Sequence, residues 1–130
     1  MVQGKTRQKR RFLFMVKDLV EIKKNQNIGI ICPEGEIVFE NSDPLKKEVK
    51  SKIRKNEDID ILIIDLNLVS YLDSTGVGFL ISLLKIMRQR QGKLVLSNLN
   101  KKIKKVIELT RLDDIIEIYE DTEQALDDLK

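Results

Sequence analysis

The chain has 130 residues, of which 42% are hydrophobic and 35% charged, with only two prolines. This length and composition are typical of one globular domain and exclude a chain that is disordered throughout. No run approaches the roughly 18 consecutive apolar residues of a membrane span, and the single cysteine, Cys32, excludes an intramolecular disulfide, so we expect a cytoplasmic protein.

Positive charge is concentrated at the start of the chain. Residues 1–14 contain five cations and no acid, which leaves 19 basic against 21 acidic side chains in the remainder. We expect residues 1–16 to form a basic, disordered leader and residues 17–130 to form the domain. Such an arm is able to bind nucleic acid or anionic lipid, but a plain leader, an expression remnant or a true start at Met15 explains it better. Because the body has no basic stripe interleaved with aromatic residues, we expect no direct nucleic-acid or membrane contact.

The domain begins with patterns typical of strands. Residues 19–23 alternate with period two, residues 24–27 form a polar turn, and residues 28–32 complete a hairpin. The Pro-Glu-Gly sequence at 33–35 then breaks or bulges the second strand.

A helix and a buried strand follow. Ser42 or Asp43 is expected to cap a helix whose first residue is Pro44. The apolar face of this helix has a spacing of four and consists of Leu45, Val49 and Ile53. The apolar run at 59–66 predicts a strand without a solvent face, and residues 74–91 predict a helix that Gly92 ends in the C′ role.

The last third repeats the alternation of strand and helix. Residues 93–97 and 115–119 predict strands. Asn98 or Asn100 starts a helix between them, and Asp121 or Thr122 caps the final one. The inward residues are Ile103, Val106, Ile107 and Thr110 in the first of these helices and Ala125, Leu126 and Leu129 in the second. The order β-β-α-β-α-β-α-β-α predicts a single α/β domain with a mixed, mostly parallel sheet and helices packed mainly on one side.

The most informative motif follows the buried strand and includes the start of the helix predicted at 74–91: Leu72-Asp73-Ser74-Thr75-Gly76-Val77-Gly78. The chain contains no histidine, and Ser74 is not in a Gly-x-Ser-x-Gly elbow. The two glycine-rich phosphate-binding motifs, Gly-x-x-x-x-Gly-Lys and Gly-x-Gly-x-x-Gly after a strand, are absent from the sequence. The carboxylates do not cluster as metal ligands do. We therefore expect no enzymatic activity, no cofactor and no metal ion.

With a catalytic nucleophile excluded, two roles remain for the polar residues of this motif: helix cap and phosphate acceptor. Asp73 is a good N-cap for the helix, but Gly76 and Gly78 each cost about 1 kcal/mol there relative to alanine. Close approach of the helix to the sheet, or of another protein to the helix, would explain the two glycines. An exposed Ser74 would receive a phosphate among free N–H groups at the positive end of the helix dipole.

The motif and the order of elements resemble the STAS domain of bacterial anti-sigma factor antagonists. The resemblance extends from about residue 18 to 129 and includes the Gly35-Glu36-Ile37 segment and the strand that begins Lys93-Leu94-Val95-Leu96. It implies a STAS-like single domain. It also implies that Ser74, with Thr75 as second choice, is phosphorylated by a GHKL-type serine kinase that is itself the anti-sigma factor. The unphosphorylated form would bind that factor and release sigma, and a PP2C-type phosphatase would restore it.

The resemblance also implies where a partner binds. The expected contact residues are Asp73, Ser74, Thr75, Gly76, Val77, Gly78 and Phe79, with Val77 and Phe79 offering apolar contact beside the hydroxyl. The chain departs from the family where an aspartate usually follows the Gly-Glu-hydrophobic segment, because Val38 and then Phe39 stand there. This departure implies a partner with a compensating apolar surface, or the alternative of a STAS subunit in a transport or signalling-scaffold complex that acts without phosphorylation.

Overall fold

The computed structural model describes residues 27–129. The leader at 1–16, the predicted strand at 19–23 and all of the predicted turn except Asn27 lie outside the described residues. The strands are β1 (Ile28–Ile31), β2 (Gly35–Ile37), β3 (Ile61–Asp65), β4 (Val69–Leu72), β5 (Lys93–Ser97) and β6 (Glu117–Tyr119). The helices are α2 (Phe39–Lys55), α3 (Ser74–Gln89), α4 (Lys101–Leu109) and α5 (Thr122–Leu129), with a 3₁₀ turn, η2 (Leu112–Asp114), between α4 and β6.

Four of these strands form a parallel sheet in the order β1-β3-β5-β6. The apolar run predicted to lack a solvent face is β3, which lies between two neighbours and has Leu62, Ile63 and Ile64 fully buried. A run buried on both faces suits a parallel sheet covered by helices. The predicted α/β fold with a mostly parallel sheet is confirmed.

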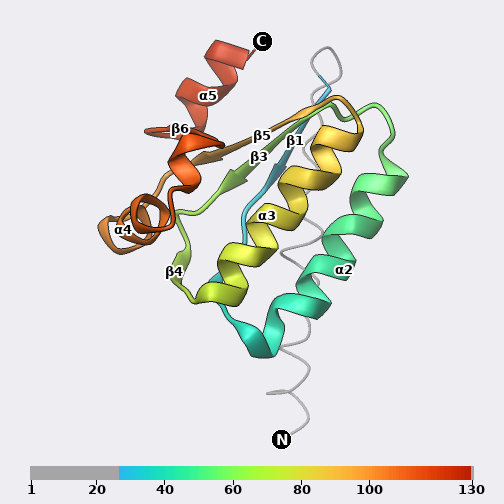
Figure 1. Ribbon diagram of the computed structural model, residues 1–130. Coiled ribbons are helices and arrows are strands. Elements are labelled where there is room, and N and C mark those ends of the chain that lie inside the picture. Colours follow the sequence, from blue (N-terminus) through green and yellow to red (C-terminus); the bar gives the residue numbers. More distant parts are fainter. Residues whose placement is uncertain (1–26, 130) are drawn as a thin grey trace, which may run out of the picture.

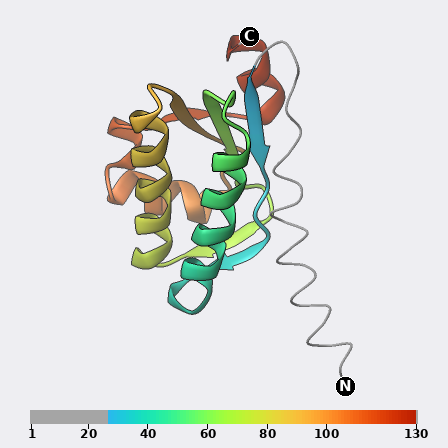
Figure 2. The same cartoon turned by 90° about the vertical axis from the view of Figure 1, so that its right-hand side faces the viewer.

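The helices cover both faces of the sheet unequally. Helices α2 and α3 lie side by side over one face, and α5 lies apart from them near the carboxyl-terminal end of the chain (Figures 1 and 2). The larger core cluster contains the buried residues of α2, α3, α4 and η2, while a smaller cluster on the other face joins Ala125 of α5 to Ile28, Ile63 and Val95. Because α5 covers the second face of the sheet, neither face of β3 is left to solvent, and β3 carries no polar face.

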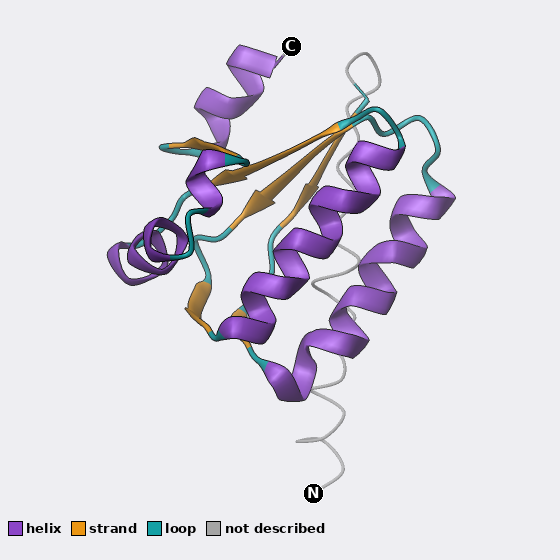
Figure 3. Ribbon diagram, in the orientation of Figure 1, coloured by secondary structure: helices purple, strands orange, loops and turns teal. Residues whose placement is uncertain are grey.

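A second, two-stranded sheet lies at the end of the molecule where α2 and α3 begin (Figure 3). It pairs β2 with β4 in parallel, with Ile37 opposite Leu72. Strand β4 was not expected from the sequence, because Ser70 and Tyr71 interrupt its apolar residues. This small sheet connects the segment before α2 with the segment before α3 and so sets the position of the polar motif.

Helix boundaries differ from the prediction at two points. Helix α2 begins at Phe39, so Ser42 and Asp43 are not its cap and Pro44 lies inside it. Helix α3 ends in a Schellman arrangement in which Gln91, with a φ of 61°, is the left-handed residue. Gly92 has a different role: a Cβ there would lie 2.4 Å from the Asp60 carbonyl oxygen.

The last helices agree more closely with the sequence. Asn100 is the N-cap of α4, and Asp121 accepts a hydrogen bond from the Gln124 N–H in the first turn of α5. Ile103 and Ile107 are buried as expected, whereas Thr110 is exposed and donates its hydroxyl to the Val106 carbonyl. The predicted strand at 115–119 is shorter and covers only Glu117–Tyr119, because the N–H groups of Ile115 and Ile116 donate to the Leu112 carbonyl oxygen and close the turn of η2.

Candidate functional site

Ser74 is the first residue of α3 and is exposed to solvent. The N–H groups of the first residues of a helix have no partner within the helix, and the dipole is positive there. Among residues 27–129 the Ser74 hydroxyl makes no hydrogen bond. The side chain is therefore available to a second protein or to a modifying enzyme without the loss of any contact within the domain.

Asp73 holds the beginnings of two helices together. Its Oδ1 accepts from the Gly76 N–H at 2.9 Å and caps α3, as the sequence predicted. Its Oδ2 accepts from the Phe39 N–H at 3.1 Å, at the first residue of α2. A carboxylate that receives N–H groups from both helices has no freedom to turn away. A fixed negative charge thus lies directly beside Ser74.

The two glycines of the motif serve different purposes. A Cβ on Gly76 would lie 2.4 Å from the Ile37 carbonyl oxygen of β2, so only glycine lets α3 approach the small sheet this closely. A Cβ on Gly78 would meet nothing within 4 Å, and Gly78 is exposed. Of the two explanations offered from the sequence, approach to the sheet applies to Gly76, and Gly78 leaves an open surface.

The structure corrects the expected apolar contact surface. Val77 and Phe79 are only 8% and 2% exposed and belong to the main core cluster, and Gly76 is buried too. The expectation that Val77 and Phe79 offer apolar surface beside the hydroxyl is wrong, because both side chains are buried in the core. The residues of the motif that a partner reaches directly are Ser74 and Gly78, with Thr75 and Asp73 partly exposed.

A groove of about 230 Å³ runs between α2 and α3 beside the motif. Its lining residues are Ser42, Asp43 and Lys46 of α2 and Thr75, Gly78, Phe79 and Ser82 of α3. Thr75 is half-buried and faces this groove, whereas Ser74 does not line it. The two neighbouring hydroxyls therefore differ in access, and Ser74 is the more exposed of the pair.

The exposed apolar residue beside the site is Phe39, one of the two residues at which the sequence departs from the family pattern. It is 74% exposed at the first residue of α2, while Val38 before it is half-buried. The Val38 N–H is satisfied by the Asn41 side-chain oxygen at 3.0 Å, so an asparagine supplies the helix-start contact. The sequence placed Phe39 in a loop before the helix, where no periodicity reveals which side chains face outward.

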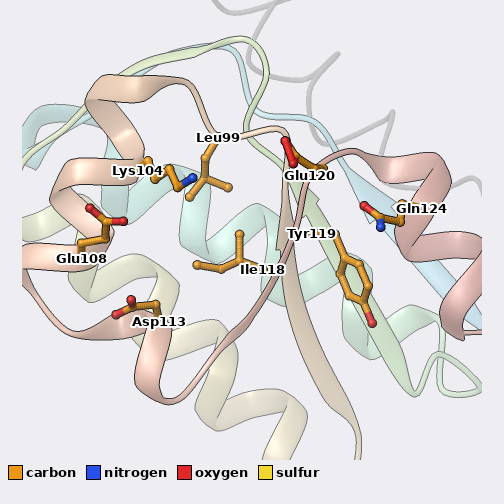
Figure 4. Close-up of a pocket in the computed structure, with 8 residues that line it drawn as sticks. All are labelled: Leu99, Lys104, Glu108, Asp113, Ile118, Tyr119, Glu120 and Gln124. Atoms are coloured by element: carbon orange, nitrogen blue, oxygen red, sulfur yellow. The ribbon is translucent and has the colours of Figure 1, made fainter.

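A larger pocket, of about 540 Å³, lies away from Ser74 between α4, η2, β6 and the start of α5 (Figure 4). Leu99 and Ile118 lie at its centre, with charged side chains of both signs around them. Tyr119 points away from these two residues, and its single hydroxyl proton is shared between the carboxylates of Asp128, 2.6 Å from the hydroxyl oxygen, and Glu117, 2.9 Å from it. These hydrogen bonds, the one to Asp128 first, raise the pKa of Tyr119 above its usual value. This tyrosine therefore joins β6 to α5 and is not poised for acid–base chemistry.

Two further features of the described residues bear on the site. Within residues 27–129 no group of three or more histidine, cysteine, aspartate or glutamate side chains is arranged to hold a metal ion. Over the same range no helix has the length and apolar character needed to cross a membrane.

Similar proteins are found both by sequence and by structure. The family model of the STAS domain matches residues 20–125. The anti-sigma-B factor antagonist of Listeria monocytogenes is 42% identical over 100 residues, covering 76% of this chain and 86% of that protein. The anti-sigma-B factor antagonist of Bacillus subtilis is 31% identical over 99 residues, covering 76% and 88%. The crystal structure of a candidate anti-sigma factor antagonist from Thermotoga maritima has a TM-score of 0.72 at 28% identity, covering 79% of this chain and 87% of that chain.

Proposed function

Because the chain belongs to the STAS domain family, and within it to the anti-sigma factor antagonists, we propose that phosphorylation of Ser74 controls its binding to an anti-sigma factor. Proteins of this class are regulators and not enzymes, in agreement with the sequence analysis. In the unphosphorylated state the protein binds an anti-sigma factor that is also a GHKL-type serine kinase, and sigma is released. The phosphorylated state does not bind, and a PP2C-type phosphatase reverses it. These steps place the protein in the cytoplasm.

The observation that carries this proposal is the isolation of the Ser74 hydroxyl at the start of α3. It is exposed and, among the described residues, makes no hydrogen bond. Thr75 is half-buried in the groove between α2 and α3, so its hydroxyl is harder for a kinase to reach. Ser74 is accordingly the first choice for the phosphoacceptor.

The local charges explain why a phosphate would act as a switch. A phosphoserine carries a charge of about −1.5 to −2 at neutral pH. Asp73 already places a negative charge beside it and is held there by the N–H groups of Gly76 and Phe39. The free N–H groups of the first turn accommodate the phosphate within the domain. A partner surface packed closely around a small hydroxyl has to accept both added bulk and a charge that it must desolvate, which weakens the complex.

Phosphopeptide mapping after incubation with ATP and the GHKL-type kinase encoded in the same genome tests the modification. We expect all label on the peptide that contains Ser74, no label on Ser74→Ala, and normal labelling of Thr75→Ala. Full labelling of Ser74→Ala would refute the assignment.

A second measurement tests the switch itself. Ser74→Glu should weaken binding to the same kinase by tenfold or more. Gln124→Glu is a matched control, because it adds the same charge in the first turn of α5, and it should bind normally. Equal affinity of Ser74→Glu and the unmodified protein would instead support the alternative, a STAS subunit that acts without phosphorylation.

A further inference from the structure

Phe39 is an aromatic side chain at an unusual level of exposure. With 74% of its surface exposed, it is matched among the described large apolar residues only by Leu109, at 75%, which lies at the end of α4. Large aromatic residues contribute strongly to binding when they enter a pocket on a partner. Because these two residues are equally exposed, their position relative to Ser74 determines which of them contacts a partner that covers Ser74.

The position of Phe39 is fixed relative to Ser74. The Phe39 N–H donates to Asp73 Oδ2 at 3.1 Å, and Asp73 directly precedes Ser74. The starts of α2 and α3 lie together at one end of the molecule (Figure 1). A protein interface of ordinary size buries about 800 Å² on each partner. A partner that covers Ser74 at that scale also reaches Phe39.

The charges around Phe39 indicate the chemistry of the complementary surface. Glu36, Glu40 and Asp43 are all exposed near the start of α2. Among residues 27–129 none of these three carboxylates forms an ion pair. An exposed apolar ring with unpaired acids within four positions of it along the chain fits an apolar pocket bordered by basic side chains.

We infer that Phe39 is the apolar anchor of the Ser74 interface, seated in a pocket of the anti-sigma factor that lysine or arginine side chains border. This inference rests on the proposed function, because it takes the protein that covers Ser74 as the occupant. The two residues then have separate roles: Phe39 supplies affinity, and the state of Ser74 determines whether the surfaces close together.

Calorimetric titration with the GHKL-type anti-sigma factor of the same genome tests the anchor. Phe39→Ala should raise the dissociation constant tenfold or more, and Phe39→Leu should raise it by an intermediate factor. Leu109→Ala, the control matched in exposure, should change it by less than twofold. In stopped-flow mixing, Glu40→Gln should lower the association rate constant and reduce the dependence of that rate constant on salt. Thermal unfolding verifies that Phe39→Ala is folded, which we expect because alanine keeps the N–H that Asp73 accepts.

The outcomes separate the anchor from the switch. If Ser74→Glu loses binding while Phe39→Ala and Leu109→Ala both bind like the unmodified protein, the proposed function stands and the anchor is refuted. If Phe39→Ala and Leu109→Ala weaken binding equally, the effect is not specific to this face and the anchor is again refuted. If the unmodified protein fails to bind the kinase, the proposed function fails and the anchor fails with it.

Discussion

Replacement of Gly76 by alanine tests the contact between α3 and the small sheet. The added Cβ would lie 2.4 Å from the Ile37 carbonyl oxygen and 3.0 Å from a methyl carbon of Leu72. The first of these atoms belongs to the backbone of β2 and has no rotamer through which to yield. An ordinary contact of about 3.4 Å therefore requires the first turn of α3 to move away from β2 by about 1 Å.

The expected cost follows from three contributions. Overpacking of a close-packed contact costs about 1–3 kcal/mol. The shift also strains the hydrogen bond from the Asp73 N–H to the Ile37 oxygen, 3.4 Å long, and the bond from Phe39 to Asp73, which together add about 1 kcal/mol. Alanine regains about 1 kcal/mol through its better helix propensity. We expect Gly76→Ala to lower the free energy of unfolding by about 1–3 kcal/mol.

Gly78→Ala is the matched control, two residues along the same helix. A Cβ there meets nothing within 4 Å, so only the propensity acts and the protein should gain up to about 1 kcal/mol. Urea unfolding followed by far-ultraviolet circular dichroism measures both variants, with an unchanged slope showing that the denatured state is the same. A Gly76→Ala protein as stable as the unmodified one, or a destabilised Gly78→Ala protein, would refute the reasoning.

Three further predictions concern side chains that join distant segments. The Arg90 guanidinium donates to the carbonyl oxygens of residues 53, 56 and 59 at 2.6–3.0 Å. Because an ammonium lacks the planar fork, Arg90→Lys should lower the free energy of unfolding by about 1–3 kcal/mol in urea titrations. An unchanged unfolding midpoint would contradict this. Asp73→Ala should cost about 1–2 kcal/mol through loss of the cap and should raise amide hydrogen exchange at Gly76 and Phe39 together; exchange that rises at Gly76 alone would show that the link to α2 is not formed. The Lys93 ammonium, followed by the Tyr119 hydroxyl, lowers the pKa of Glu117 in the folded state. The resulting stabilisation is therefore present above the unfolded pKa of about 4.5 and is lost as the pH falls through the lowered value. Glu117→Gln should be less stable than the unmodified protein by about 0.2–1 kcal/mol at pH 7 and equally stable at pH 2, and a difference that persists at pH 2 would contradict this reasoning.

Patterns that involve neighbouring residues were readable from the sequence. The apolar run of β3 has no polar face, which requires burial on both sides wherever the strand lies in the sheet. Asp73 and Asn100 cap the helices that follow them because a cap acts on N–H groups two or three residues away. The position of Ser74 at the start of α3 follows from the same local chemistry. Its role as phosphoacceptor stays a prediction.

Contacts between distant segments were decided by the tertiary structure. Helix α2 begins at Phe39 in part because Asp73, 34 residues later, accepts its N–H, and no local pattern around Pro44 reveals such a partner. Strand β4 exists because β2 lies beside it. Its residues alone carry no clear alternation.

The surface of the candidate site was likewise set by packing. Gly76 and Gly78 are the same residue type, but two positions along a helix turn them about 200° apart around its axis. Which of the two faces the small sheet depends on where β2 lies. The packing of α3 against α2 and β5 buries Val77 and Phe79 in the core, whereas Phe39 stays exposed. The sequence by itself determined which residues gather at the start of α3. Only the packing of α3 against α2 and the strands determined which of them a partner is able to touch, because exposure is a property of the assembled faces and not of the residues.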